Sequence, residues 1–126
     1  MLIGKKDKIK KKLKEIGLNE NFNIEITNST DAQKREKYVN FLFRKLQREQ
    51  GLLERDCDRM VRNDRVIWGS CMVSCGDVDA MVTGNSRKYF TSLEKISKVV
   101  SSRPGEIMFG LNMIVSKGRC KIGCRW

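Results

Sequence analysis

Residues able to hold a negatively charged group occur close together near the middle of this 126-residue chain. Thr83 offers a hydroxyl group, Gly84 allows a sharp turn that presents backbone N–H groups, and Arg87 carries a planar guanidinium. Such donors together suit a phosphate or a carboxylate. A second interpretation stays open, because turns between a strand and a helix also carry such residues simply to cap the helix.

Neighbouring charged residues extend this candidate site. Arg65 is a candidate for a second ligand to the anion, although an arginine there equally suits a salt bridge on a helix face. Asp77 and Asp79 precede a short apolar run, where a carboxylate serves more often as a cap or turn residue than as a general base. We therefore expect an anion-binding site and assign no catalytic residue.

The chain has five cysteines and no histidine. Cys71 with Cys75 and Cys120 with Cys124 form two C-x-x-x-C pairs, and four thiolates are enough to hold a zinc ion. However, this spacing differs from that of the usual zinc knuckle, and Cys71 lies in an apolar helical pattern. An odd number of cysteines also argues against a complete set of disulfides. We expect reduced thiols and no metal site.

The elements that position these side chains are predicted from the spacing of apolar residues. Helices are expected over residues 7–16, about 31–50, 53–62, 64–76 and about 89–100, and strands over residues 2–4, 22–26, 80–82 and 107–115. A turn is expected at Lys117-Gly118, and residues 119–126 fit no element. Alternating strands and helices predict an α/β fold with a layered, mostly parallel sheet flanked by helices.

The apolar run Ala80–Val82 is the central strand of this prediction. Its length suits a strand buried on both faces, and Thr83 and Gly84 would then lie where the strand ends. Ligands of open α/β sheets bind beyond the carboxyl ends of the strands. The hypothesis therefore requires Ala80–Val82 to lie in a sheet and Arg87 to point toward the end of that strand.

Composition limits the class of protein. A hydrophobic content of 40% and a charged content of 33% in 126 residues are typical of one globular domain. The chain has no apolar run of membrane-spanning length and no signal peptide, so we expect a cytoplasmic protein that does not contact membranes. The net charge of +11 is compatible with nucleic-acid binding. Yet the lysines of residues 5–14 alternate with Ile9 and Leu13, which favours an amphipathic helix with a solvated charged face.

Five stretches resemble phosphate acetyl/butyryl transferases, and most closely the phosphotransacetylase-like C-terminal domain of bacterial NADP-dependent malic enzymes. These stretches are Leu2–Gly4, Ile24–Asn28, Arg55–Gly69, Gly76–Tyr89 and Pro104–Gly110. The pattern Thr-Gly-x-x-Arg-x-Tyr in the fourth stretch points to the malic-enzyme branch. The resemblance covers nearly the whole chain and implies a fold similar to that of isopropylmalate dehydrogenases, in two subdomains.

The resemblance also implies a function. Active transferases exchange the acyl group of acyl-CoA for phosphate, whereas in malic enzymes the domain looks like a regulatory, oligomer-forming module that senses acetyl-CoA. Thr83, Gly84, Ser86 and Arg87 match the phosphate-side loop of that scheme. The implied ligands are acetyl-CoA and phosphate. NADP and a divalent metal belong to the malic domain, and a homo-oligomer is implied for the full-length parent.

The sequence departs from the family at both ends. It starts after the first strand–helix unit of the family, and the Ser-Arg and Asp positions that perform acyl transfer in active members have no counterpart. We therefore expect residues 1–119 to be a partial transferase domain, residues 120–126 to be an unplaced tail, and this piece alone to be inactive. Two alternatives stay open: part of a genuine phosphate acetyltransferase or butyryltransferase, and a small basic nucleic-acid-binding protein.

Overall fold

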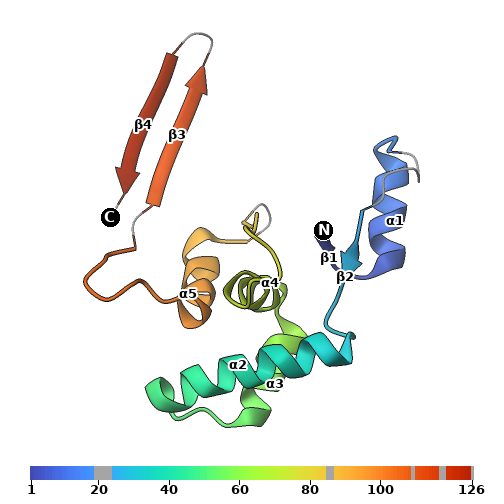
Figure 1. Ribbon diagram of the computed structural model, residues 1–126. Coiled ribbons are helices and arrows are strands. Elements are labelled where there is room, and N and C mark those ends of the chain that lie inside the picture. The colour runs from blue at the N-terminus through green and yellow to red at the C-terminus, as the bar shows by residue number, and fades with distance from the viewer. Residues whose placement is uncertain (19–23, 85–86, 109, 117–118, 126) are drawn as a thin grey trace.

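The computed structural model describes residues 1–18, 24–84, 87–108, 110–116 and 119–125, with side chains up to residue 108. Helices and strands follow one another as shown in Figure 1. The helices are α1 (Lys6–Glu15), α2 (Ala32–Gln50), α3 (Glu54–Asn63), α4 (Arg65–Ser74) and α5 (Tyr89–Val99), and the strands are β1 (Leu2–Ile3), β2 (Ile26–Thr27), β3 (Gly110–Ser116) and β4 (Arg119–Arg125). All five predicted helices are therefore confirmed. None of the described helices is both long and apolar enough to cross a bilayer.

Local signals explain where the long helix α2 begins and ends. The side chain of Asp31 accepts a hydrogen bond from the backbone N–H of Lys34 at 3.2 Å, which satisfies one of the free donors of the first turn. Gly51 ends the helix with φ 63°, a left-handed conformation that costs a glycine little. Tyr38, Leu42 and Leu46 recur along one face and are completely buried. An apolar stripe at this spacing makes the helix bury one side.

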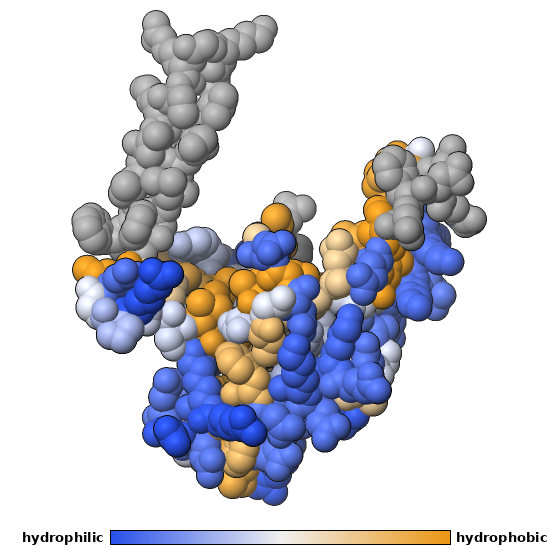
Figure 2. Space-filling view, viewed as in Figure 1, coloured by the Kyte–Doolittle hydropathy of each residue, from blue (hydrophilic) through white to orange (hydrophobic). Residues whose placement is uncertain are grey.

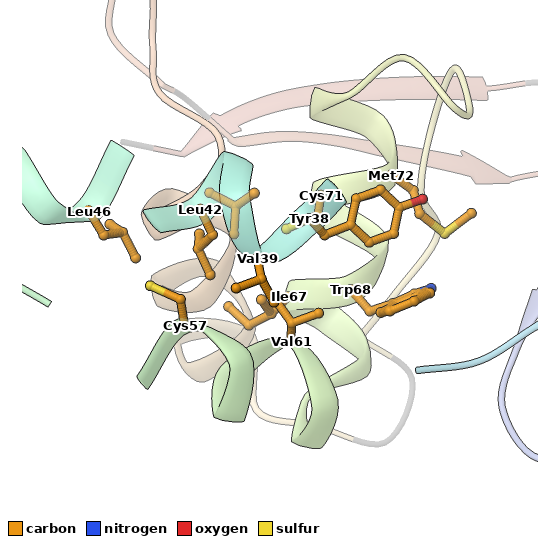
Figure 3. Packing of buried hydrophobic residues seen from close by; sticks show 11 residues of the cluster. Tyr38, Val39, Leu42, Leu46, Cys57, Val61, Ile67, Trp68, Cys71 and Met72 are labelled. Carbon is orange, nitrogen blue, oxygen red and sulfur yellow. The ribbon is translucent and has the colours of Figure 1, made fainter. Parts of the chain in front are cut away.

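The hydrophobic core lies between helices α2, α3, α4 and α5. Figure 3 shows side chains of α2 facing those of α3 and α4. Tyr38 meets the ring of Trp68 edge to face, with ring centroids 4.9 Å apart, an arrangement that aromatic quadrupoles favour. The buried cluster comprises Tyr38, Val39, Leu42, Leu46, Cys57, Val61, Ile67, Trp68, Cys71, Met72 and Val99. Helix α4 is therefore the central element of the core.

Strands β1 and β2 form a parallel pair beside this core. Leu2 is paired with Ile26 and Ile3 with Thr27. Helix α1 covers one side of the pair and α4 the other (Figure 1), and the side chain of Ile3 approaches Gly69 of α4. The layered contact between helices and a parallel strand pair confirms an α/β fold. Of the strand predicted over residues 22–26, only Ile26 lies in β2; residues 24–25 form no strand, and residues 22–23 lie outside the described residues.

The expectation for Ala80–Val82 is wrong, because this run forms no strand. The side chain of Val82 is fully exposed, at 101% of its reference area. An extended segment needs a neighbour for its backbone N–H and C=O groups as well as for its side chains. In the described part of the chain, β1 is hydrogen-bonded only toward β2, and no backbone hydrogen bond joins residues 80–82 to it.

The expectation for the C-terminal residues is also wrong. Residues Arg119–Arg125 form strand β4, which is paired antiparallel with β3, from Gly110 opposite Arg125 to Ser116 opposite Arg119. Figure 1 shows this hairpin extending away from the helices. The alternation of Cys120, Ile122 and Cys124 with charged residues or glycine was the overlooked signal, since a period of two indicates a strand. The described strands thus form one parallel and one antiparallel pair, not one mostly parallel sheet. The predicted turn at Lys117-Gly118 lies outside the described residues.

Candidate anion-binding site

An open cavity of about 730 Å³ lies between strand β1, helix α4 and residues 78–84. Ile3, Met72 and Met81 are among its apolar lining residues. Figure 2 shows apolar side chains gathered on this face of the molecule. Polar groups at the margin come from α4 and from the segment that follows it. A mainly apolar hollow with a few convergent polar groups is the usual form of a ligand site.

Four of the five residues predicted for anion binding line this cavity. They are Arg65, Thr83, Gly84 and Arg87, while Ser86 lies outside the described residues. Gly84 has φ 107°, a conformation that other residues rarely adopt, so the turn at this point depends on glycine. The residues converge although the expected strand is absent. The site is therefore formed by a loop that crosses α4, not by the end of a central strand.

The guanidinium of Arg87 is held by the carboxylate of Asp64. Its Nη1 atom lies 3.0 Å from Oδ1 and 3.2 Å from Oδ2 of Asp64. The Arg87 side chain is 40% exposed, whereas that of Asp64 is 15% exposed. Among the described residues, Nε and Nη2 of Arg87 have no hydrogen-bond partner. Arg87 thus already pairs with one anion and keeps donors for another.

Asp64 joins three elements through its carboxylate. It accepts a hydrogen bond from the backbone N–H of Val66 at 2.9 Å, which caps helix α4, and it also pairs with Lys95 of α5. Burial by itself would raise the pKa of Asp64. The hydrogen bonds from Lys95, Val66 and Arg87 outweigh burial, so the pKa lies below its ordinary value and the carboxylate stays charged.

Arg65 is the first residue of α4, and its exposed side chain lines the same cavity. The structure shows no ion pair of Arg65 with any residue that it describes, so the alternative of a helix-face salt bridge finds no support there. A second guanidinium beside Arg87 adds positive charge to the cavity. Arginine suits oxyanions because its rigid fork of donors matches the spacing of their oxygens.

The sequence of this chain matches a known protein family over the residues that form the cavity. The model of the Phosphate acetyl/butaryl transferase family matches residues 1–122, which include every residue of the candidate site. The chain belongs to this family. The predicted membership in the phosphate acetyl/butyryl transferase family is thus confirmed.

Two curated relatives are malic enzymes. The chain is 37% identical over 118 residues to the probable NADP-dependent malic enzyme of Rickettsia prowazekii (strain Madrid E), covering 93% of this chain and 15% of that protein. It is 32% identical over 120 residues to the NADP-dependent malic enzyme of Rhizobium meliloti (strain 1021), covering 94% of this chain and 16% of that protein. The chain therefore spans about a sixth of the length of these relatives. The predicted resemblance to a phosphotransacetylase-like region of NADP-dependent malic enzymes is confirmed.

Asp77 and Asp79, which precede the loop with Thr83 and Gly84, have different surroundings. Asp77 accepts hydrogen bonds from Lys37 Nζ and from Tyr38 Oη, each at 2.6 Å. These two bonds lower the pKa of Asp77 and tie the start of the loop to helix α2. Asp77 thus has the structural role expected for it. Asp79 is exposed and lines the cavity.

The cysteines of the described core are free thiols. Cys57 and Cys71 are buried, and Cys75 is partly buried. Burial raises the pKa of the Cys71 thiol to about 12, so this side chain behaves as a small apolar residue. Within the residues whose side chains are described, no cluster of potential metal ligands is present. The absence of a metal site in the whole chain stays a prediction.

Two residues of the site were not predicted from the sequence. Asp64 directly precedes an apolar helical pattern, which is the position of an N-cap, so its role as a cap was detectable. Its contact with Arg87 joins residues 23 positions apart and has no sequence signal. Lys95 was missed because it lies on α5, one of many lysines with no distinguishing spacing.

Proposed function

We propose that the cavity between β1, α4 and residues 78–84 binds the phosphate group of acetyl-CoA or acetyl phosphate, or inorganic phosphate. The proposal assigns this role to Arg65, Thr83, Gly84, Ser86 and Arg87. In this view the chain is a ligand-sensing, oligomer-forming region of an NADP-dependent malic enzyme. The observation that carries the proposal is the convergence of two arginines, a threonine and a positive-φ glycine on one open cavity.

The chemistry of the cavity supports this ligand class. Arg65 and Arg87 supply two positive charges, and Arg87 retains donors beside its bonds to Asp64. Charge-assisted hydrogen bonds from guanidinium to phosphate are among the stronger polar contacts in proteins. The apolar lining around them suits the acyl and pantetheine-like parts of a ligand, which are less polar than its phosphate. An incoming oxyanion would either bind Arg87 together with Asp64 or displace the Asp64 carboxylate from Arg87.

The proposal also concerns the fold of the parent protein. We propose that this chain belongs there to a layered, isopropylmalate dehydrogenase-like fold with a mostly parallel sheet; the parallel pair β1–β2 between α1 and α4 supports this, whereas the antiparallel pair β3–β4 does not. The parent would be a cytoplasmic homo-oligomer. NADP and a divalent metal would be bound by the malic part of that parent. Light scattering of the full-length parent tests the assembly.

Binding to the chain tests the phosphate site directly. Titration calorimetry with acetyl-CoA and with inorganic phosphate should give saturable binding, and Arg87→Gln should weaken it about tenfold because a charged donor is lost. Arg103→Gln is the matched control, because Arg103 is exposed and lines none of the cavities described here. Equal binding by the two variants would refute the proposal.

A second candidate function is acyl transfer, and the family match favours it. In that reaction acyl-CoA and phosphate give acyl phosphate and CoA, so the same cavity would hold the phosphate that attacks the thioester. Formation of acetyl phosphate by the full-length parent distinguishes the two functions. Turnover would assign a transferase, and binding of acetyl-CoA without turnover would assign a sensor.

A further inference from the structure

A second, smaller cavity of about 230 Å³ lies at the carboxyl ends of the parallel strands β1 and β2. Its wall is formed by Gly4–Lys5 directly after β1, Asn28–Ser29 directly after β2, and Asn63–Arg65 with Trp68 around the start of α4. None of the residues predicted for anion binding lines it except Arg65. In open α/β sheets this edge is where ligands bind, because loops and helix N-termini converge there.

The indole of Trp68 is an unusual member of this wall. Trp68 is only 1% exposed, and its Nε1 atom is buried and has no hydrogen-bond partner among the described residues. Figure 3 shows that nitrogen at the edge of the ring that points away from the core cluster. Contact with Tyr38 fixes the ring in this orientation. A buried donor that lacks an acceptor among these residues points to an acceptor atom that they do not supply.

The other groups around the cavity are mainly donors. Helix α1 begins here after Lys5, and none of the described side chains caps its N-terminus. The free N–H groups of a first turn and the helix dipole favour an anion. Lys5 and Arg65 add positive charge, and Ser29 adds a hydroxyl. The carboxylate of Asp64 also borders the cavity, but it already accepts bonds from Val66, Arg87 and Lys95.

We propose that this cavity binds a phosphate-sized oxyanion, at a site separate from the first cavity. The indole N–H of Trp68 donates to one oxygen, while Lys5 and the N-terminus of α1 balance its charge. The volume is below the range usual for whole small-molecule ligands, so it suits a phosphate group and not an entire nucleotide. The group is either free inorganic phosphate or the terminal phosphate of a larger ligand.

Nuclear magnetic resonance of the indole N–H tests this assignment. A Trp126→Phe variant of the full chain leaves Trp68 as the single tryptophan, so its indole signal is unambiguous. Adding inorganic phosphate at constant ionic strength, with chloride as the replaced anion, should shift this signal saturably. Adenosine monophosphate is the second probe. A shift with either probe supports the site, and a shift with the nucleotide alone assigns the phosphate to a larger ligand.

Charge-neutral variants show whether the proposed donors bind the anion. Lys5→Gln should raise the apparent Kd of the indole shift about tenfold, because a charge-assisted contact is lost. Lys11→Gln is the matched control: it removes the same charge from helix α1, which Lys5 precedes, but Lys11 lines neither cavity, so the Kd should change less than about twofold.

The outcome is independent of the proposed function. Thr83→Val should weaken binding at the first cavity and leave the indole titration unchanged, because Thr83 lines the first cavity but not the second and, unlike Arg87, is not paired with Asp64. An indole signal that responds to neither probe would mean that water satisfies Trp68, and the proposal would be overturned. The same conclusion follows if Lys5→Gln and Lys11→Gln have equal effects.

Discussion

Helix α4 and the segment that follows it are both apolar, yet only the helix buries its side chains. Every residue from Val66 to Met72 is buried, whereas Ala80 and Val82 are exposed. A helix satisfies its backbone hydrogen bonds internally and needs only neighbouring side chains, which α2, α3 and α5 provide. An extended segment needs a paired backbone as well. An apolar segment is therefore buried only where the fold also provides neighbours for its side chains and, if the segment is extended, for its backbone.

This difference also shapes the candidate site. One wall of the first cavity is the packed helix α4, anchored by the cap and the ion pairs of Asp64. The opposite wall is the exposed segment 78–84, which is tied down at its start by Asp77 and at its end by Arg87. A rigid wall facing a less packed one suits a site that responds to its ligand.

The largest expected effect tests whether the helices carry the stability. Leu42→Ala empties a completely buried position, and we expect a loss of about 2–5 kcal/mol in the free energy of unfolding. Leu53→Ala makes the same chemical change at a position that is 54% exposed, and should cost less than about 1 kcal/mol. Urea denaturation of both variants measures the difference. Similar losses would show that the core lies elsewhere.

A change of intermediate size tests the contact between the two regions. A Cβ atom at Gly69 would lie 2.5 Å from Sδ of Met81 and 3.1 Å from Cδ1 of Ile3. Gly69→Leu therefore pushes both neighbours away from α4, and overpacking of this kind costs about 1–3 kcal/mol. Ser74→Leu, at an exposed position of the same helix, is the control. Equal denaturation midpoints would mean that residues 78–84 do not pack on α4.

The smallest effect concerns the ion pairs that join the two regions. Asp64→Asn retains a helix cap but loses the charge that holds Arg87 and Lys95, so we expect a loss of about 1–2 kcal/mol at neutral pH. Asp79→Asn is the control, because Asp79 shows no hydrogen bond or ion pair with the described residues.

The effect of Asp64→Asn should depend on pH with a definite sign. The pKa of Asp64 is lowered in the folded protein, so its stabilisation is fully present above the unfolded value of about 3.9. It is lost as the pH falls through the lowered folded value. Denaturation curves of the wild type and the variant should therefore converge in acid. A stability difference between wild type and variant that persists after Asp64 is protonated would show that the charge of Asp64 is not its cause.

Much of the fold was predictable because its signals are local. The cap at Asp31, the glycine at position 51 and the apolar stripe of Tyr38, Leu42 and Leu46 define α2 through residues that are close together in the chain. The alternation in Arg119–Arg125 was equally local and was overlooked. For the site, Thr83 and Arg87 were predicted as donors from their residue types and from the resemblance to the phosphate-side loop of the transferases, since hydroxyl and guanidinium groups are the usual ligands of phosphate.

The sequence by itself determined the helices, their caps and the family, because each depends on residues close together in the chain or on a residue pattern. Only the tertiary structure decided that, among the described residues, Ala80–Val82 stays unpaired and the indole nitrogen of Trp68 is buried without a partner, and that Arg87 meets Asp64. The physical reason is that these features depend on which distant surfaces meet. Backbone pairing, ion pairing and burial are properties of neighbours in space, and the order of residues does not specify them locally.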